Sequence, residues 1–162
     1  MENCCIIFNC TIVYYTMKHE PESISHLLPA ERQNNYIYLL DDFKSSYEVM
    51  KYLVNFSRTQ SPLKDEEASI ACILDECSLH VRYIYRLDHD RRVHIRVNSD
   101  SQVVQGVLAV FADIYQGGTE KEIRQAPPVF QNYLPQGIAP SFERKDGVKR
   151  LYYRLLTYVQ GW

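Results

Sequence analysis

Residues 81–115 read VRYIYRLDHDRRVHIRVNSDSQVVQGVLAVFADIY, and this stretch decides the fold. Val81, Tyr83, Tyr85 and Leu87 alternate with Arg82, Ile84 and Arg86, and apolar and polar side chains alternate again over 93–97, which is the period of a β-strand with one buried face. The residues between them, 88–91, are of the kind that forms a hairpin turn, although the usual Asn-Gly or Asp-Gly pair is absent. We therefore expect two antiparallel strands joined by a tight turn.

A strongly apolar helix is predicted over 103–115, because its apolar side chains recur at helical spacing. Residues 98–100, Asn-Ser-Asp, are of the type that caps a helix at its N-terminus, and Gly117-Gly118 are of the type that ends one. Gly106 lies inside the helix, where it costs about 1 kcal/mol relative to Ala. A glycine at such a position indicates close approach by another element.

The flanking sequence extends this pattern in both directions. Residues 46–57 predict an amphipathic helix, and 62–75 a long connection with an acidic patch. Downstream, Thr119 and Glu122 match the capping box of a short helix, and a last helix is expected from about Arg144. The order predicts an α+β fold, in which a small antiparallel sheet is covered on one face by helices.

The chain has 162 residues and a formal charge of −2. This length suits one domain, and the near-neutral charge argues against a nucleic-acid binder that works by bulk charge. No apolar run is long enough to predict a membrane span. Residues 1–35 are irregular, so we expect an N-terminal extension of unknown role, followed by a folded domain over 36–162.

The five cysteines do not predict a disulfide framework, because their number is odd and three of them fall within the first ten residues. They are Cys4, Cys5, Cys10, Cys72 and Cys77. A reducing compartment is the better expectation. We therefore expect a cytoplasmic protein, or a plastid or mitochondrial one if the source is a eukaryote.

The motifs of phosphate loops, zinc proteases and serine hydrolases are absent from the sequence. Cys77 is a candidate reactive residue, because it lies where the long connection meets the first strand. Cys72, Cys77 and His80 form a possible set of zinc ligands, but their spacing is not a usual one. Along an extended strand His80 would lie about 10 Å from Cys77, too far to share a proton with its sulfur. The five arginines of the hairpin predict a solvated basic face.

From Cys77 to Ile123 the chain resembles the SufE family of sulfur acceptors without a gap, and the resemblance extends over about 39–159. The positions that carry it are Cys77, Val81, Asn98-Ser99-Asp100, Val104-x-Gly106, Tyr115, Gly118-Thr119-x-x-Glu122-Ile123, Pro140-Ser141 and Arg144-x-x-Gly147. The departures surround the cysteine. Glu76 stands where the family has Gly, Leu79 where it has Ser, and Arg82 where it has Trp.

This resemblance implies a SufE-like fold and an accessory role in iron–sulfur cluster assembly. The implied partners are a cysteine desulfurase, which is a pyridoxal-phosphate enzyme, and a cluster scaffold. Cys77 would accept the persulfide sulfur, while Ser99, Asp100, Arg82 and Arg144 would support its loop or contact the desulfurase. The chain itself would need no cofactor, no metal and no independent catalytic machinery.

Two other functions stay open on the sequence alone. The departures at Glu76, Leu79 and Arg82 are compatible with a SufE-like module that docks on a partner without carrying sulfur. The set Cys72, Cys77 and His80 would instead serve a separate thiol or metal-binding protein.

Overall fold

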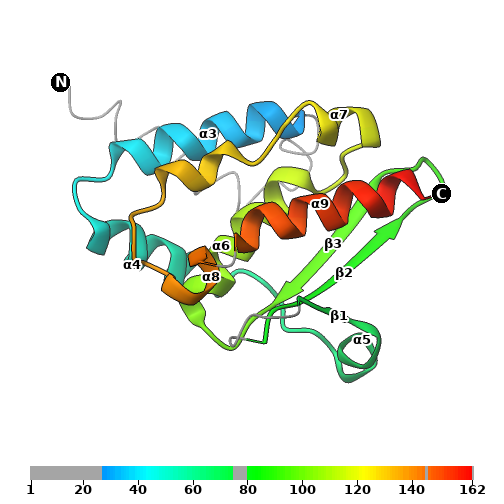
Figure 1. The fold of residues 1–162 in the computed structure, drawn as a ribbon, viewed down its shortest axis with the longest axis horizontal. Coiled ribbons are helices and arrows are strands. Elements are labelled where there is room, and N and C mark those ends of the chain that lie inside the picture. Colours follow the sequence, from blue (N-terminus) through cyan, green and yellow to red (C-terminus); the bar gives the residue numbers. More distant parts are fainter. Residues whose placement is uncertain (1–26, 75–79, 145, 162) are drawn as a thin grey trace.

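The computed structural model describes residues 27–74, 80–144 and 146–161. Within these ranges the chain forms a three-stranded antiparallel sheet, seven α-helices and one 3-10 helix. The strands stand in the order β1-β2-β3, and helices pack over one face of the sheet (Figure 1). The predicted α+β architecture is confirmed. No helix in these ranges is long and apolar enough to span a bilayer.

Strands β2 (Arg82–Leu87) and β3 (Val93–Asn98) form the predicted hairpin. Its turn is organised by one carboxylate. Asp88 Oδ1 accepts hydrogen bonds from the backbone N–H groups of Asp90 and Arg92, each at 2.9 Å. An Asp side chain that bonds the following backbone in this way stabilises a turn without the Asn-Gly pair.

The two faces of the sheet are covered unequally. The face toward the helices carries the alternating side chains that the sequence predicted to be buried, with Leu87 only partly covered: Val81, Tyr83, Tyr85, Val93, Ile95 and Val97. The other face is not bare, because Ile84 is only 7% exposed there. Opposite Ile84 in the register, Arg96 donates to the carbonyl of Pro62 at 3.0 Å and to the carboxylate of Glu67 at 3.1 Å. The segment that contains Pro62 and Glu67 therefore lies across this outer face of the sheet.

The long connection predicted over 62–75 is wrong in part, because it contains α5 (Asp65–Ile70) and β1 (Cys72–Ile73). Helix α5 buries none of its residues, and both residues of β1 are exposed. Neither element therefore produces the apolar periodicity from which helices and strands are predicted. Strand β1 extends the sheet by pairing Cys72 with Tyr83.

Helix α6 (Gln102–Tyr115) is almost entirely buried and lies against α4 (Ser46–Ser57), the predicted amphipathic helix. The two backbones meet at Gly106. A Cβ atom there would overlap the carbonyl of Leu53 and lie 2.8 Å from its Cα. The predicted close approach is confirmed, and the approaching element is the backbone of α4.

Helix α3 (Pro29–Asp42) begins inside the segment 1–35 that was expected to be irregular. Arg32 is 7% exposed, and its Nη1 donates to the carbonyls of Asp113 at 2.9 Å and Gln116 at 2.6 Å. These carbonyls lie at the C-terminal end of α6. The end of the predicted extension is thus helical and packed on the core, while its boundary with the domain stays a prediction.

Asp113 joins α3 to α6 through its carboxylate. The hydroxyl of Tyr36 donates to Asp113 Oδ2 at 2.7 Å. Burial raises the pKa of Asp113, while the hydrogen bond from Tyr36 and the charge of Arg32 act in the opposite direction. The net shift is upward, so desolvation outweighs both partners.

Helix α7 (Glu120–Arg124) has the predicted capping box. The backbone N–H of Thr119 donates to Glu122 Oε2 at 2.8 Å, and the N–H of Glu122 points back to the Thr119 hydroxyl at 3.4 Å. These two bonds satisfy backbone donors at the start of a helix, which have no partner within it.

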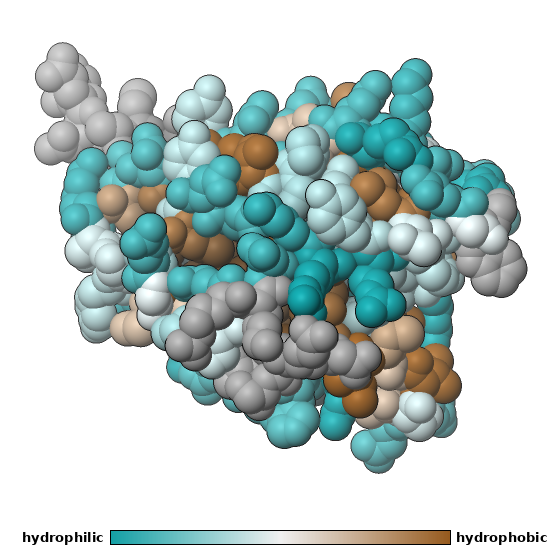
Figure 2. Space-filling view, in the orientation of Figure 1, coloured by the Kyte–Doolittle hydropathy of each residue, from teal (hydrophilic) through white to brown (hydrophobic). Residues whose placement is uncertain are grey.

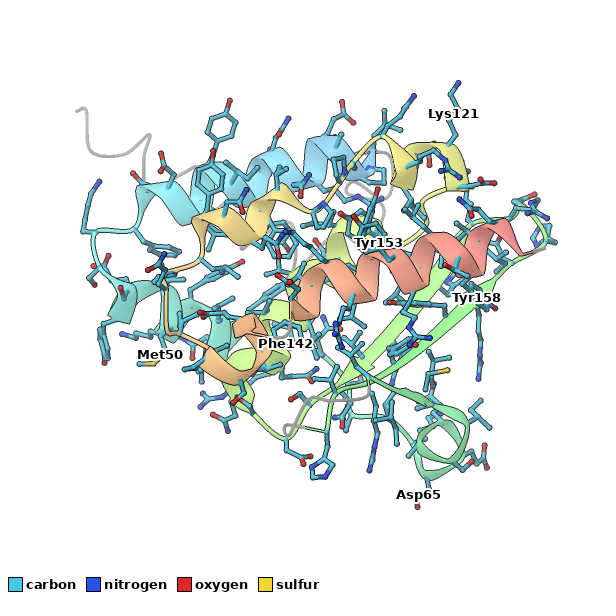
Figure 3. The ribbon with its side chains drawn as sticks, in the orientation of Figure 1. Met50, Asp65, Lys121, Phe142, Tyr153 and Tyr158 are labelled. Atoms are coloured by element: carbon cyan, nitrogen blue, oxygen red, sulfur yellow. The ribbon has the colours of Figure 1, made fainter. Side chains whose placement is uncertain are left out.

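The last helix, α9 (Gly147–Gln160), begins at Gly147 and not near Arg144 as predicted. Before it come a 3-10 helix η1 (Val129–Tyr133) and a short helix α8 (Pro140–Arg144). The helical conformation is interrupted between α8 and α9 at Asp146, whose backbone is left-handed with φ at +51°. A side chain on Gly147 would overlap the ring of Phe142, which lies where α8 meets α9 (Figure 3).

Helix α9 buries the stripe that the sequence predicted, with Leu156 only partly covered: Val148, Leu151, Tyr152, Leu155 and Val159. It lies between α7 and the sheet (Figure 1). Tyr85 of β2 donates its hydroxyl to the carbonyl of Leu151 at 3.0 Å. Its ring also lies 5.9 Å from that of Tyr158, which is labelled in Figure 3. Aromatic contacts therefore hold α9 on the sheet.

Gly106→Ala tests the contact between α4 and α6. Helix propensity alone would raise the free energy of unfolding by about 1 kcal/mol. The overlap with Leu53 should reverse the sign and lower it by about 2 kcal/mol, since the backbone must move apart. Urea denaturation measures the difference. Gly161→Ala is the control, because a Cβ there would lie at an ordinary 3.4 Å from the Thr157 carbonyl. A stabilised Gly106→Ala protein would contradict the close approach.

Asp113→Asn tests the buried carboxyl. Its raised pKa means that the folded state keeps a proton that the unfolded state loses. Wild-type stability should therefore decrease as the pH rises from about 4, the unfolded value, through the folded pKa. The Asn variant should not show this decrease relative to wild type. Urea denaturation from pH 4 to pH 8 measures it, with the exposed Asp41→Asn as control. Parallel pH profiles for wild type and Asp113→Asn would count against the raised pKa.

Candidate functional site

The connection that carries Cys77 is anchored at both of its ends. Leu74 follows β1 and is 3% exposed, and Val81 precedes β2 and is fully buried. The N–H of Leu74 donates to the carbonyl of Val81 at 2.9 Å. Residues 75–79, with Cys77 among them, lie outside the described residues, as do the departures Glu76 and Leu79. The structure shows what holds the ends of this segment, and the role of the sulfur stays a prediction.

His80 precedes the buried Val81 and has a left-handed backbone, with φ at +44°. The expectation that His80 lies on an extended strand is therefore wrong, because β2 begins only at Arg82. The separation of about 10 Å from Cys77 was derived from an extended strand. That estimate no longer applies to His80.

His80 makes a contact with Asp100 that the sequence analysis did not foresee. Its Nδ1 lies 2.7 Å from Asp100 Oδ2, and the two residues are 20 positions apart in the chain. Each side chain is 67% exposed. The pair joins the end of the Cys77 connection to the turn between β3 and α6.

The turn that bears Asp100 is held by Gln105 from the first turns of α6. Gln105 Oε1 accepts the N–H of Ser99 at 2.7 Å, and its Nε2 donates to the carbonyl of Val97 at 3.3 Å. The hydroxyl of Ser99 accepts the N–H of Ser101 at 3.3 Å. The backbone on either side of Asp100 is therefore tied down.

The predicted helix cap at residues 98–100 is wrong by one position. The cap is Ser101, whose hydroxyl accepts the N–H of Val104 at 3.3 Å. Several cap-type residues follow one another here, so composition alone could not choose among them. Ser99 and Asp100 are left to form the turn, and Asn98 ends β3.

Arg82 and Arg144 fall in different parts of the fold. Arg82 is half-buried at the start of β2, with Ile73 and Asn98 as its partners in the register. It therefore lies at the end of the sheet where the His80–Asp100 pair is found. Arg144 is the last residue of α8 and not part of the last helix, and its side chain is outside the described residues.

Three of the five hairpin arginines bond within the molecule, although Arg91 and Arg92 are exposed to solvent. Arg92 donates to the carbonyl of Gly117 at 2.8 Å, and Arg91 reaches the carbonyl of Val159 at 3.4 Å. Arg96 pairs with Glu67, whose pKa is lowered first by the backbone N–H of Lys64 and also by Arg96. These contacts argue for structural roles.

The set Cys72, Cys77 and His80 is not brought together by any described contact. Cys72 is exposed on β1 opposite Tyr83, and His80 is paired with Asp100. Among the described residues, no group of three or more His, Cys, Asp or Glu side chains is placed to hold a metal ion. A set that includes Cys77 is not covered by this statement, because that residue is undescribed.

An exposed apolar surface lies over α5 and β1, immediately before the Cys77 connection. Ile70 is 60% exposed and Ile73 is 55% exposed. Figure 2 shows hydrophobic side chains gathered over these two elements. We refer to Ile70 and Ile73 as the α5–β1 surface.

Residues 34–159 match the SufE family, described as an Fe–S metabolism associated domain. The match spans most of the chain, so this protein belongs to the SufE family. The resemblance seen in the sequence is confirmed. Membership places the chain in iron–sulfur metabolism, which is a coarser statement than sulfur acceptance on a particular cysteine.

Sequence reasoning missed two features of this region, the His80–Asp100 pair and the bracing of its turn by Gln105. Both join residues across a turn whose shape the sequence does not reveal. The only available signal was that Asp100 and Gln105 flank a predicted helix start, where polar side chains often bond the backbone.

Gln105→Ala tests the bracing of the turn. It removes the acceptor of the Ser99 N–H and the donor to the Val97 carbonyl. The free energy of unfolding should fall by about 1–2 kcal/mol. Urea denaturation measures the loss. Gln102→Ala on the same helix is the matched control, because Gln102 is exposed. Equal effects of the two substitutions would show that Gln105 does not hold the turn.

Proposed function

We propose that this protein accepts a sulfur atom on Cys77 from a cysteine desulfurase and passes it to iron–sulfur cluster assembly. The observation that carries the proposal is membership in the SufE family over 34–159. Within that match, Cys77 stands in ungapped register with the motifs through Ile123 that resemble the family. The proposal goes beyond membership, because it assigns the chemistry to one thiol.

The proposed step is a thiol exchange in which atoms and charge balance. The thiolate of Cys77 attacks the outer sulfur of a persulfide on the desulfurase. A new S–S bond forms on Cys77 as the S–S bond on the desulfurase breaks, and the desulfurase cysteine leaves as a thiolate. The rate of such a step depends on the thiolate fraction and on access to the sulfur.

The anchoring of the connection supports this proposal. Its two ends meet through the bond between Leu74 and Val81, which lie directly beside strands β1 and β2 of a sheet packed against helices. A connection fixed at both ends on a rigid scaffold is where proteins often carry reactive groups. We expect Ser99 and Asp100 to support the connection from the neighbouring turn.

The desulfurase must contact the chain around Cys77 for sulfur to pass directly. The α5–β1 surface precedes the connection, and exposed apolar side chains of this kind mark contacts between proteins. Arg82 stands at the start of β2, after the connection. We expect these residues, together with Arg144, to meet the desulfurase.

The second candidate is a docking module that binds the desulfurase but carries no sulfur. The observation that favours it is the set of departures around the cysteine, Glu76, Leu79 and Arg82. Arg82 is half-buried in the sheet, so the replacement of the family's Trp is accommodated within the fold. The two candidates share a partner and differ in the fate of Cys77.

Sulfur loading separates them. The protein is mixed with a cysteine desulfurase and cysteine without reductant, and its intact mass is recorded. We expect the mass to rise by one sulfur atom and to return with dithiothreitol. Cys77→Ser should abolish the gain, because it removes the attacking thiolate.

Cys72→Ser is the matched control, since Cys72 is an exposed thiol on β1 and should not be needed. Binding of each variant to the desulfurase is measured in parallel. If the wild-type protein binds its own organism's desulfurase and gains no sulfur, the docking module is the correct function. If Cys72→Ser abolishes loading and Cys77→Ser does not, the acceptor has been misassigned.

A further inference from the structure

We propose that the hydrogen-bonded pair of His80 and Asp100 is a positioning device for sulfur transfer, because it fixes the residue at which the connection that carries Cys77 ends. This inference rests on the proposed function, and it assigns to two side chains a role beyond that of the acceptor cysteine. Its basis is the 2.7 Å contact between His80 Nδ1 and Asp100 Oδ2.

The backbone of His80 needs such a restraint. Its φ of +44° lies in the left-handed region, which side chains other than Gly adopt uncommonly, although His, Asn and Asp do so more readily than most. A residue in this region persists where the surrounding structure favours it. The bond to Asp100 favours the left-handed backbone of His80, the residue at which the connection ends.

The anchor at Asp100 is firm because its turn is braced. Gln105 bonds the backbone before Asp100, at Val97 and Ser99, and the Ser99 hydroxyl accepts the N–H of Ser101 after it. Ser101 then caps α6, the helix that is buried along almost its whole length. A side chain that bonds Asp100 is therefore connected, through this turn, to helix α6 of the core.

The connection is closed from its other end as well. Leu74 donates to the carbonyl of Val81, the residue that directly follows His80. The backbone bond and the His80–Asp100 contact together fix the residues on either side of the segment 75–79. Restraint of this kind raises the rate of a reaction between two positioned groups.

The protein contains other exposed His–Asp pairs that do not share this property. His89 lies 3.2 Å from Asp90, its neighbour in the chain, within the hairpin turn. Adjacent residues cannot tie two distant segments together. Its side-chain exposure, 89% and 68%, makes it a suitable control for substitution of an exposed histidine.

The test compares loading rates of Cys77 in His80→Asn, Asp100→Ala and the double variant. Asn keeps the tolerance for a left-handed backbone but is too short to retain the contact. Each single change should lower kcat for loading about two- to five-fold, the range expected for a contact between two exposed side chains. The KM of the desulfurase for this protein should stay unchanged, because the substitutions do not affect how the two proteins bind each other. The double variant should be no slower than either single one.

Rescue and control complete the comparison. Exchanging the partners, with His80→Asp and Asp100→His, should restore kcat to within about two-fold of wild type, since Asp also tolerates a left-handed backbone. His89→Asn should load at the wild-type rate. Wild-type rates in both single variants, or additive losses in the double variant, would overturn the proposal.

Hydrogen exchange of the Leu74 amide gives a readout that does not depend on sulfur. Exchange should be several-fold faster in His80→Asn and Asp100→Ala and unchanged in His89→Asn, because the amide bonds Val81 beside His80. If the wild-type protein is not loaded at all, the proposed function fails, and the exchange rates alone decide whether the pair restrains the connection. Unchanged exchange in both variants would show that it does not.

Discussion

The backbones of α4 and α6 come close enough that no side chain fits between them at Gly106, and the remaining elements depend on this contact. It places α6 deep in the core, where the helix supports the hairpin of β2 and β3 along one face. The start of α6 then determines the turn that carries Asp100, and its end receives the guanidinium of Arg32. The absence of a Cβ at Gly106 thus lets α4 and α6 pack closely, and α6 makes further contacts with the rest of the fold at each of its ends.

The elements that could be predicted from the sequence are those that bury a regular stripe or face. The hairpin and α6 have clear apolar periods, and the capping box of Thr119 and Glu122 predicts the start of α7. Helix α5 and strand β1 bury little, so no period marks them. The start of α9 at Gly147 could not be predicted, because neither the left-handed backbone at Asp146 nor the contact between Gly147 and Phe142 leaves an apolar period in the sequence.

The candidate site also contains features that sequence motifs indicate and one contact that only the tertiary structure shows. A register of motifs along the chain points to Cys77 and to residues 98–100 without knowledge of the turn's shape, and the role of Cys77 stays a prediction because it lies outside the described residues. The contact between His80 and Asp100 could not, because it forms only when a left-handed residue and a braced turn face each other. The local rules instead placed His80 on a strand, and tertiary structure overrode them.

The contacts of α3 also bear on how much of the chain is needed for folding. The family match begins at residue 34, yet Arg32 and Pro29 lie before it and pack on the core. Arg32 closes the end of α6 by bonding two of the carbonyls that a helix leaves open at its C-terminus. A chain cut at the family boundary would leave these acceptors without their cation. The packed structure of this protein therefore reaches upstream of the matched region, into sequence that the family match does not include.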